Sequence, residues 1–177
     1  MDLSILSKEE LDRLQSFTAE RRKVEFYYTR LLWKSFGYNE FIQYTEEGSP
    51  IVSNGKISVS HSRHHIVIGW SESNVVGIDI ENYSEKVIRV CNKFMSEAEI
   101  SRFGNQEMKI LTTIWSIKEA VFKMRPKDHL IFKDQIEIVS LHQDSNFNIH
   151  YSNRTENMQF RIIHLDDAVI TYCLSKI

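Results

Sequence analysis

Apolar residues in the first third of the chain recur at the three-to-four-residue spacing of helices. The segment Ser7-Lys8-Glu9-Glu10 precedes this pattern. A serine followed three residues later by a glutamate can satisfy the free backbone amides of a helix start, so we expect a helix to begin here. The helical pattern continues, in two pieces, to about Phe36, and Gly37 is a residue type that commonly ends a helix.

The rest of the chain alternates between strand-like and helical patterns. Ser96 to Glu99 repeats the helix-start pattern, with Gly104 as the expected end of that helix. The clearest amphipathic helix spans Met108 to Met124 and is closed by Pro126. Alternation of apolar and polar residues predicts strands at 57–60, 65–71, 75–81, 136–139, 147–151, 158–164 and 168–174. The order helix, strands, helices, strands predicts an α+β fold.

Composition narrows the class of protein. The chain has 177 residues, which suits one compact domain or two small joined lobes. Its 22 Lys and Arg residues nearly balance 24 Asp and Glu residues, which argues against a broad nucleic-acid-binding surface. No run approaches the roughly 18 apolar residues of a membrane span, and no signal-peptide pattern opens the chain. We therefore expect a cytoplasmic protein that binds neither nucleic acid nor membrane.

Two carboxylates stand together in a predicted strand. Asp79 and Glu81 are two positions apart, so they project from the same face while Ile78 and Ile80 point to the other. Adjacent carboxylates repel each other unless a cation or a proton lies between them, and hard oxygen ligands suit Mg²⁺. A strand end that runs into solvent explains the same pattern without a metal.

Three further residues are candidates for chemistry. Glu119 and Lys123 lie four apart on an otherwise apolar helix and therefore share a face. They form either a surface ion pair or part of a polar site. His61 ends a predicted strand, and a lone histidine there is more often structural or solvent-exposed than functional.

Taken together, the three segments carry a family resemblance. In chain order they are Ile57-Ser58-Val59-Ser60-His61-Ser62, Val76-Gly77-Ile78-Asp79-Ile80-Glu81 and Trp115-Ser116-Ile117-Lys118-Glu119-Ala120-Val121-Phe122-Lys123. This order resembles the 4'-phosphopantetheinyl transferase superfamily, whose most specific marks are G-x-D-x-E and W-x-x-K-E-A-x-x-K. The serine-histidine-serine segment is similar to the larger, pseudo-dimeric, surfactin-synthetase-activating type. The resemblance extends from about Arg21 to Ser175.

The resemblance implies a fold and a reaction. Two similar lobes, residues 1–74 and 75–177, would be related by a pseudo-twofold axis, with coenzyme A between them. The reaction would be that of a holo-[acyl-carrier-protein] synthase. The phosphopantetheine arm of coenzyme A would move to a serine of an apo acyl or peptidyl carrier protein, releasing 3',5'-ADP, with magnesium as cofactor. Because both lobes lie in one chain, the protein would be a monomer.

The resemblance also assigns roles to residues. Asp79, Glu81 and Glu119 would bind Mg²⁺, with Glu119 as the leading candidate for the base and Lys123 stabilising charge on the bridging oxygen. His61, helped by Ser60, would contact the 3'-phosphate of coenzyme A. Lys118 and Lys123 would face its phosphates. Arg30 and Arg22 would help to hold its nucleotide end.

Other features leave alternatives open. Glu99 can be either the partner of Ser96 at the helix start or an acidic group of the active site. Ser49 stands where family members often carry lysine, and Arg63 could compensate. A docking patch for an acidic carrier could be formed by Lys86, Arg89, Lys93 and Arg102, although nearby glutamates reduce its positive charge.

Two other functions compete with the transferase. They are a metal-dependent phosphohydrolase and a non-catalytic module that binds coenzyme A or a carrier protein.

Overall fold

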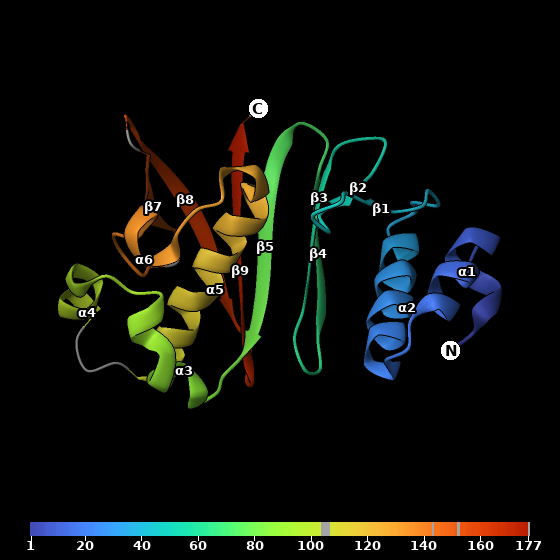
Figure 1. Ribbon diagram of the computed structural model, residues 1–177, viewed down its shortest axis with the longest axis horizontal. Helices are drawn as coiled ribbons and strands as arrows, with labels where there is room; N and C mark the ends of the chain where they lie inside the picture. Colours follow the sequence, from blue (N-terminus) through green and yellow to red (C-terminus); the bar gives the residue numbers. More distant parts are fainter. Residues whose placement is uncertain (104–106, 143, 152, 177) are drawn as a thin grey trace.

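The computed structural model describes residues 1–103, 107–142, 144–151 and 153–176 (Figure 1). Two helices open the chain, α1 (Lys8–Ser16) and α2 (Glu20–Ser35). The first expected helix start is confirmed, because the amide of Glu10 donates to Ser7 Oγ and the amide of Ser7 donates to Glu10 Oε2. Gly37 follows α2 with a φ of +86°, a conformation that glycine adopts at little cost.

Two small antiparallel hairpins come next. One joins β1 (Gln43–Tyr44) to β2 (Pro50–Ile51), and the other joins β3 (Lys56–His61) to β4 (Ile66–Ser71). The second hairpin packs beside α2 and β5, as Figure 1 shows. Trp33 of α2, Ile42 and Ile57 of β3 form a buried hydrophobic cluster beside this hairpin. The N-terminal half of the chain therefore has an apolar cluster of its own.

The C-terminal half is built on a five-stranded antiparallel sheet in the order β5-β9-β8-β7-β6. Its strands are β5 (Asn74–Asn82), β6 (Ile136–Ile138), β7 (Asp144–His150), β8 (Thr155–His164) and β9 (Ala168–Lys176). β5 is an edge strand that also packs against the β3–β4 hairpin. In this register Asp79 lies opposite Thr171 of β9. The expected strands are confirmed, with ends that differ by a few residues.

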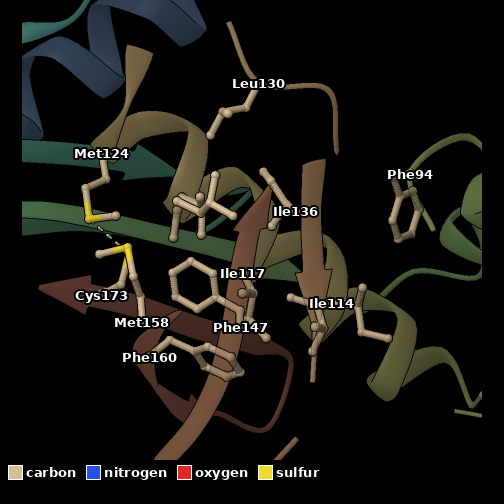
Figure 2. Close-up of a cluster of buried hydrophobic side chains, with 14 of the residues drawn as sticks. Phe94, Ile114, Ile117, Met124, Leu130, Ile136, Phe147, Met158, Phe160 and Cys173 are labelled. Atoms are coloured by element: carbon tan, nitrogen blue, oxygen red, sulfur yellow. Dashed lines mark hydrogen bonds between the residues drawn. The ribbon is translucent and has the colours of Figure 1, made fainter. Parts of the chain in front are cut away.

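Four helices accompany this sheet: α3 (Lys86–Val90), α4 (Glu97–Phe103), α5 (Met108–Met124) and α6 (Phe132–Gln135). α5 has the expected bounds and packs across β5 and β9 (Figure 1). Its buried side, with Ile114 and Ile117, meets Phe147 and Phe160 of the sheet in the main hydrophobic core (Figure 2). Gly104, the expected end of α4, lies outside the described residues.

The chain therefore forms a mixed fold of helices and antiparallel sheets. This agrees with the expected α+β fold class. Within the described ranges, no helix combines the length and the apolar character that crossing a membrane requires. The division into lobes at residue 75 stays a prediction.

Candidate active site

The strand β5 places Asp79 and Glu81 on the side that faces helix α5. Asp79 is almost fully buried, and its Oδ1 accepts hydrogen bonds from Ser60 Oγ at 2.8 Å and from Lys123 Nζ at 2.6 Å. Lys123 Nζ also donates to Ser60 Oγ at 2.7 Å. Residues from β3, β5 and α5 therefore meet at one point, which joins the three sequence segments in space.

Helix α5 contributes a stripe of partly accessible side chains along one face. Trp115, Glu119 and Lys123 follow each other at four-residue intervals, so their side chains lie one above the other. Trp115 Nε1 donates to Glu81 Oε1 at 3.0 Å, and Lys123 reaches Asp79. The remaining faces of the helix are almost entirely buried, so this stripe is where α5 can meet a substrate.

The carboxylates of the site carry unfavourable negative charge. Burial, followed by repulsion from Asp79 and Glu81, raises the pKa of Glu119 to about 7, although Lys123 opposes the shift. Burial and the charge of Asp79 also raise the pKa of Glu81, while the hydrogen bond from Trp115 lowers it. A glutamate with a pKa near 7 exchanges its proton readily at neutral pH, which suits a general base.

The same groups fit a hard divalent cation in their chemistry. All the candidate metal ligands are carboxylate oxygens, which hard cations prefer. One of them, Asp79 Oδ2, is buried without a hydrogen-bond partner. Burial and mutual repulsion raise the pKa values of Glu81 and Glu119, and a bound cation would offset both effects. Among the residues described, no three His, Cys, Asp or Glu side chains are gathered tightly enough to hold an ion as they stand. Because hydrogen bonds hold Asp79 and Glu81 in place, the side chain that would have to move toward an ion is that of Glu119.

Lys118 does not join this site, and the expectation that it faces phosphates is corrected here. Its side chain is fully buried, and its Nζ donates to Glu99 Oε2 at 2.8 Å and to the carbonyl oxygens of Phe132 and Ile136. All three donors of the ammonium group are used. Burial lowers the pKa of Lys118, and the carboxylate of Glu99 opposes that shift.

Glu99 has a structural role in this arrangement. Its Oε2 accepts from the amide of Ser96, and the Glu99 amide donates to Ser96 Oγ, which confirms the second expected helix start. Its Oε1 accepts from the amide of Ile138. Because Glu99 is fully buried by these partners and Lys118, the structure favours the helix-start alternative.

His61 and Ser60 occupy opposite sides of β3, because successive strand residues alternate. Ser60 belongs to the Asp79 cluster, whereas His61 lines a separate pocket of about 320 Å³. The expectation that both hold one phosphate is therefore corrected. Arg22, Gly48 and Pro50 line the same pocket as His61. Burial lowers the pKa of His61, so the imidazole is neutral at pH 7.

Arg22 and Arg30 differ in what they can reach. Arg22 is exposed at the pocket, where its Nη1 donates to Glu25 Oε2 at 3.0 Å. Arg30 is fully buried, with its Nε 3.3 Å from Glu10 Oε1 and its Nη2 donating to the carbonyl of Ile42. The expectation that Arg30 holds a nucleotide is corrected. Its guanidinium is buried between α1 and α2, where it contacts Glu10.

The structure also places Ser49, the departure from the family pattern, and Arg63, the residue expected to compensate for it. The amide of Ser49 donates to Thr45 Oγ1 in the turn that borders the His61 pocket. Arg63 lines a different groove, beside α2, and its amide donates to Asn82 Oδ1. Arg63 therefore does not replace a lysine at position 49.

Trp115 is a site residue to which the sequence interpretation gave no role. The available signal was its spacing, four positions before Glu119, which places both residues on the same helix face. Its contact with Glu81, 34 residues away, depends on how α5 crosses β5.

Comparisons with known proteins identify the family. A family model described as the 4'-phosphopantetheinyl transferase superfamily matches residues 75–173. A Bacillus subtilis protein named 4'-phosphopantetheinyl transferase ffp is 28% identical, over 81% of this chain and 75% of its own length. The matched region contains Asp79, Glu81, Glu119 and Lys123. The chain belongs to the 4'-phosphopantetheinyl transferase superfamily.

Proposed function

We propose that this protein transfers 4'-phosphopantetheine from coenzyme A to a serine of an apo acyl or peptidyl carrier protein, with Mg²⁺ as cofactor. The observation that carries the proposal is the meeting of Asp79, Glu119 and Lys123, from two segments of the family pattern, at one partly accessible site. Residues 1–74 and 75–177 would be the two lobes, and one chain would then suffice for activity.

In the proposed reaction the carrier serine oxygen forms a bond to the β-phosphorus of coenzyme A. The bond between that phosphorus and the bridging oxygen breaks, and 3',5'-ADP leaves. Glu119, whose pKa is about 7 before any ion binds, is the proposed acceptor of the serine proton. The ammonium of Lys123 stabilises the negative charge that develops on the phosphate oxygens. A divalent ion held by Asp79, Glu81 and Glu119 would supply further positive charge at the pyrophosphate.

The pocket that contains His61 is the proposed site for the nucleotide end of coenzyme A. It lies next to the carboxylates, because His61 directly follows Ser60 on β3. His61 and Arg22 offer hydrogen-bond donors there. In the proposed complex Glu25 orients the guanidinium of Arg22 at the pocket through their 3.0 Å contact.

The carrier protein is proposed to dock at α3. Lys86 and Arg89 are exposed on α3, as are the apolar side chains of Ile88 and Val90, and Lys93 is exposed on the 3-10 helix that follows (Cys91–Lys93). The segment follows β5 directly, within a few residues of Glu81. Arg102 does not belong to the basic patch expected from the sequence, because its guanidinium donates to the carbonyl of Ile138 and to Glu137.

The deciding experiment is the intact mass of an apo carrier protein incubated with this protein, coenzyme A and Mg²⁺. We expect a gain of one phosphopantetheine group, abolished by EDTA and by Glu119→Ala in a variant that remains folded. Glu97→Ala, at an exposed carboxylate on α4, is the control that should retain transfer. Release of 3',5'-ADP without modification of any carrier would instead support a phosphohydrolase. Binding of coenzyme A without either product would support a non-catalytic module.

A further inference from the structure

The indole of Trp115 is held in one orientation beside Glu81. Its ring packs against Phe94, with centroids 5.1 Å apart, and against Phe132 at 5.5 Å. This packing directs Nε1 to Glu81 Oε1 at 3.0 Å. An indole nitrogen can only donate, so Oε1 of Glu81 is the acceptor and gives one of its lone pairs to this contact. The other oxygen, Oε2, has no hydrogen-bond partner within the described part of the chain.

Asp79 is divided in the same way. Both of its donors, Ser60 Oγ and Lys123 Nζ, bind Oδ1, and Oδ2 is buried without a partner. The two strand carboxylates therefore share one arrangement, in which protein donors occupy one oxygen and the second is left free. The donors come from different elements, β3 for Ser60 and α5 for Trp115 and Lys123.

Such an arrangement matters for the choice between cations. A carboxylate oxygen that already accepts a hydrogen bond from a fixed donor has fewer lone pairs for a cation, so the other oxygen is the better ligand and coordination through both oxygens is disfavoured. Mg²⁺ is small and demands nearly ideal octahedral coordination, whereas Ca²⁺ accepts six to eight oxygens and readily takes both oxygens of a carboxylate. Groups that orient metal ligands commonly change metal affinity by about 10-fold to 100-fold when they are removed.

We propose that Trp115 is a positioning residue for metal selectivity: its N–H keeps Glu81 a single-oxygen ligand and so favours Mg²⁺ over Ca²⁺. This inference rests on the proposed function only in taking Asp79, Glu81 and Glu119 as the cation site. In this role Trp115 acts through its hydrogen bond to Glu81.

The test compares Mg²⁺ and Ca²⁺ binding by calorimetry, using protein saturated with coenzyme A and no carrier, so that no turnover occurs. Trp115→Phe removes the N–H and keeps an aromatic ring against Phe94 and Phe132. Trp70→Phe is the matched control, because Trp70 Nε1 also makes a 3.0 Å hydrogen bond, to the carbonyl of Asn54. Incorporation of 3-benzothienylalanine at position 115 removes the N–H and keeps the shape of the indole.

We expect both changes at position 115 to weaken Mg²⁺ binding about 10-fold or more, with a smaller loss for Ca²⁺. Trp70→Phe should leave both affinities unchanged. An unchanged ratio of the two affinities at position 115 would overturn this inference and leave the proposed function intact. Failure of the wild-type protein to bind Mg²⁺ would overturn both the inference and the metal requirement. Failure of carrier modification despite Mg²⁺ binding would count against the proposed function alone.

Discussion

A Cβ atom on Gly77 would lie 2.0 Å from the carbonyl oxygen of Ala120, so β5 and α5 approach each other backbone to backbone. Gly77 is two residues before Asp79, and Ala120 directly follows Glu119. This approach brings Lys123 Nζ within 2.6 Å of Asp79 Oδ1. The glycine of the G-x-D-x-E pattern therefore sets the distance between the strand carboxylates and the helix stripe.

Gly77→Ala tests that relationship. The added methyl group meets backbone atoms, which cannot rotate away, so α5 must shift. We expect a loss of about 3 kcal/mol in the free energy of unfolding, together with loss of transfer. The control is Gly37→Ala, where no atom lies within 4 Å and only the positive φ is unfavourable. That control should cost about 1 kcal/mol and retain transfer. Urea unfolding and the mass assay measure both effects, and a stable, active Gly77→Ala variant would contradict the argument.

Lys118 and Lys123 should respond differently to replacement by methionine. Lys118→Met leaves Glu99 buried without its cation, so we expect it to cost about 3–5 kcal/mol of stability. Lys123→Met should cost less, because Lys123 is partly exposed, but should reduce transfer about 100-fold or more. Adding Glu99→Gln to Lys118→Met should recover part of the lost stability. The transfer rate per folded molecule should fall more in Lys123→Met than in Lys118→Met. The opposite order would contradict the structural role of Lys118 and the active-site role of Lys123.

Helix periodicity already separates these two lysines. Residues five apart on an α-helix point about 140° away from each other, so positions 118 and 123 cannot both face one site. Glu119 and Lys123, four apart, can. Likewise, the two-residue period of a strand predicts that Asp79 and Glu81 share a face and that Ser60 and His61 do not. Here the family resemblance was less informative than local geometry.

Contacts between distant segments could not be read from the sequence. Arg30 is buried because Glu10, 20 residues away, meets its guanidinium between α1 and α2. Lys118 is buried because α4 and the segment that ends in β6 supply its three acceptors. Local patterns fix the bounds of α5 and the starts of α1 and α4 closely, but they contain no information about which buried charge another element will neutralise.

The raised pKa of Glu119 predicts a pH dependence of stability in the absence of divalent ions. Unfolding would return this pKa from about 7 to 4.5. Between these values the folded protein holds a proton that the unfolded chain releases, so the free energy of unfolding should fall as pH rises. Glu119→Gln removes this loss. In EDTA, we expect the variant to gain roughly 1 to 3 kcal/mol relative to wild type between pH 4.5 and pH 8. Urea titrations at several pH values measure this gain, with Glu97→Gln as an exposed control; equal pH profiles would refute the shift.

The basic surface of α3 predicts a selective effect on the carrier. Reversing two charges, with Arg89→Glu and Lys93→Glu, should raise the carrier KM about 10-fold by repelling an acidic partner, while the KM for coenzyme A stays constant. The control is the pair Lys127→Glu and Lys133→Glu, at exposed positions after α5. The effect should weaken at high salt, because surface charges are screened. No change in carrier KM would exclude docking at α3 by charge.

The pocket assignment predicts that His61 distinguishes coenzyme A from dephospho-coenzyme A, which lacks the 3'-phosphate. A hydrogen bond to a charged group contributes about 1.5–3 kcal/mol, so His61→Ala should raise the KM for coenzyme A about 10-fold or more. The KM for dephospho-coenzyme A should not change, because the lost partner is absent from that substrate. His64→Ala is the control, because this exposed histidine lines the other groove beside α2. Equal increases for both substrates would place His61 elsewhere along the nucleotide, since a contact to the adenine or ribose would be lost in either case.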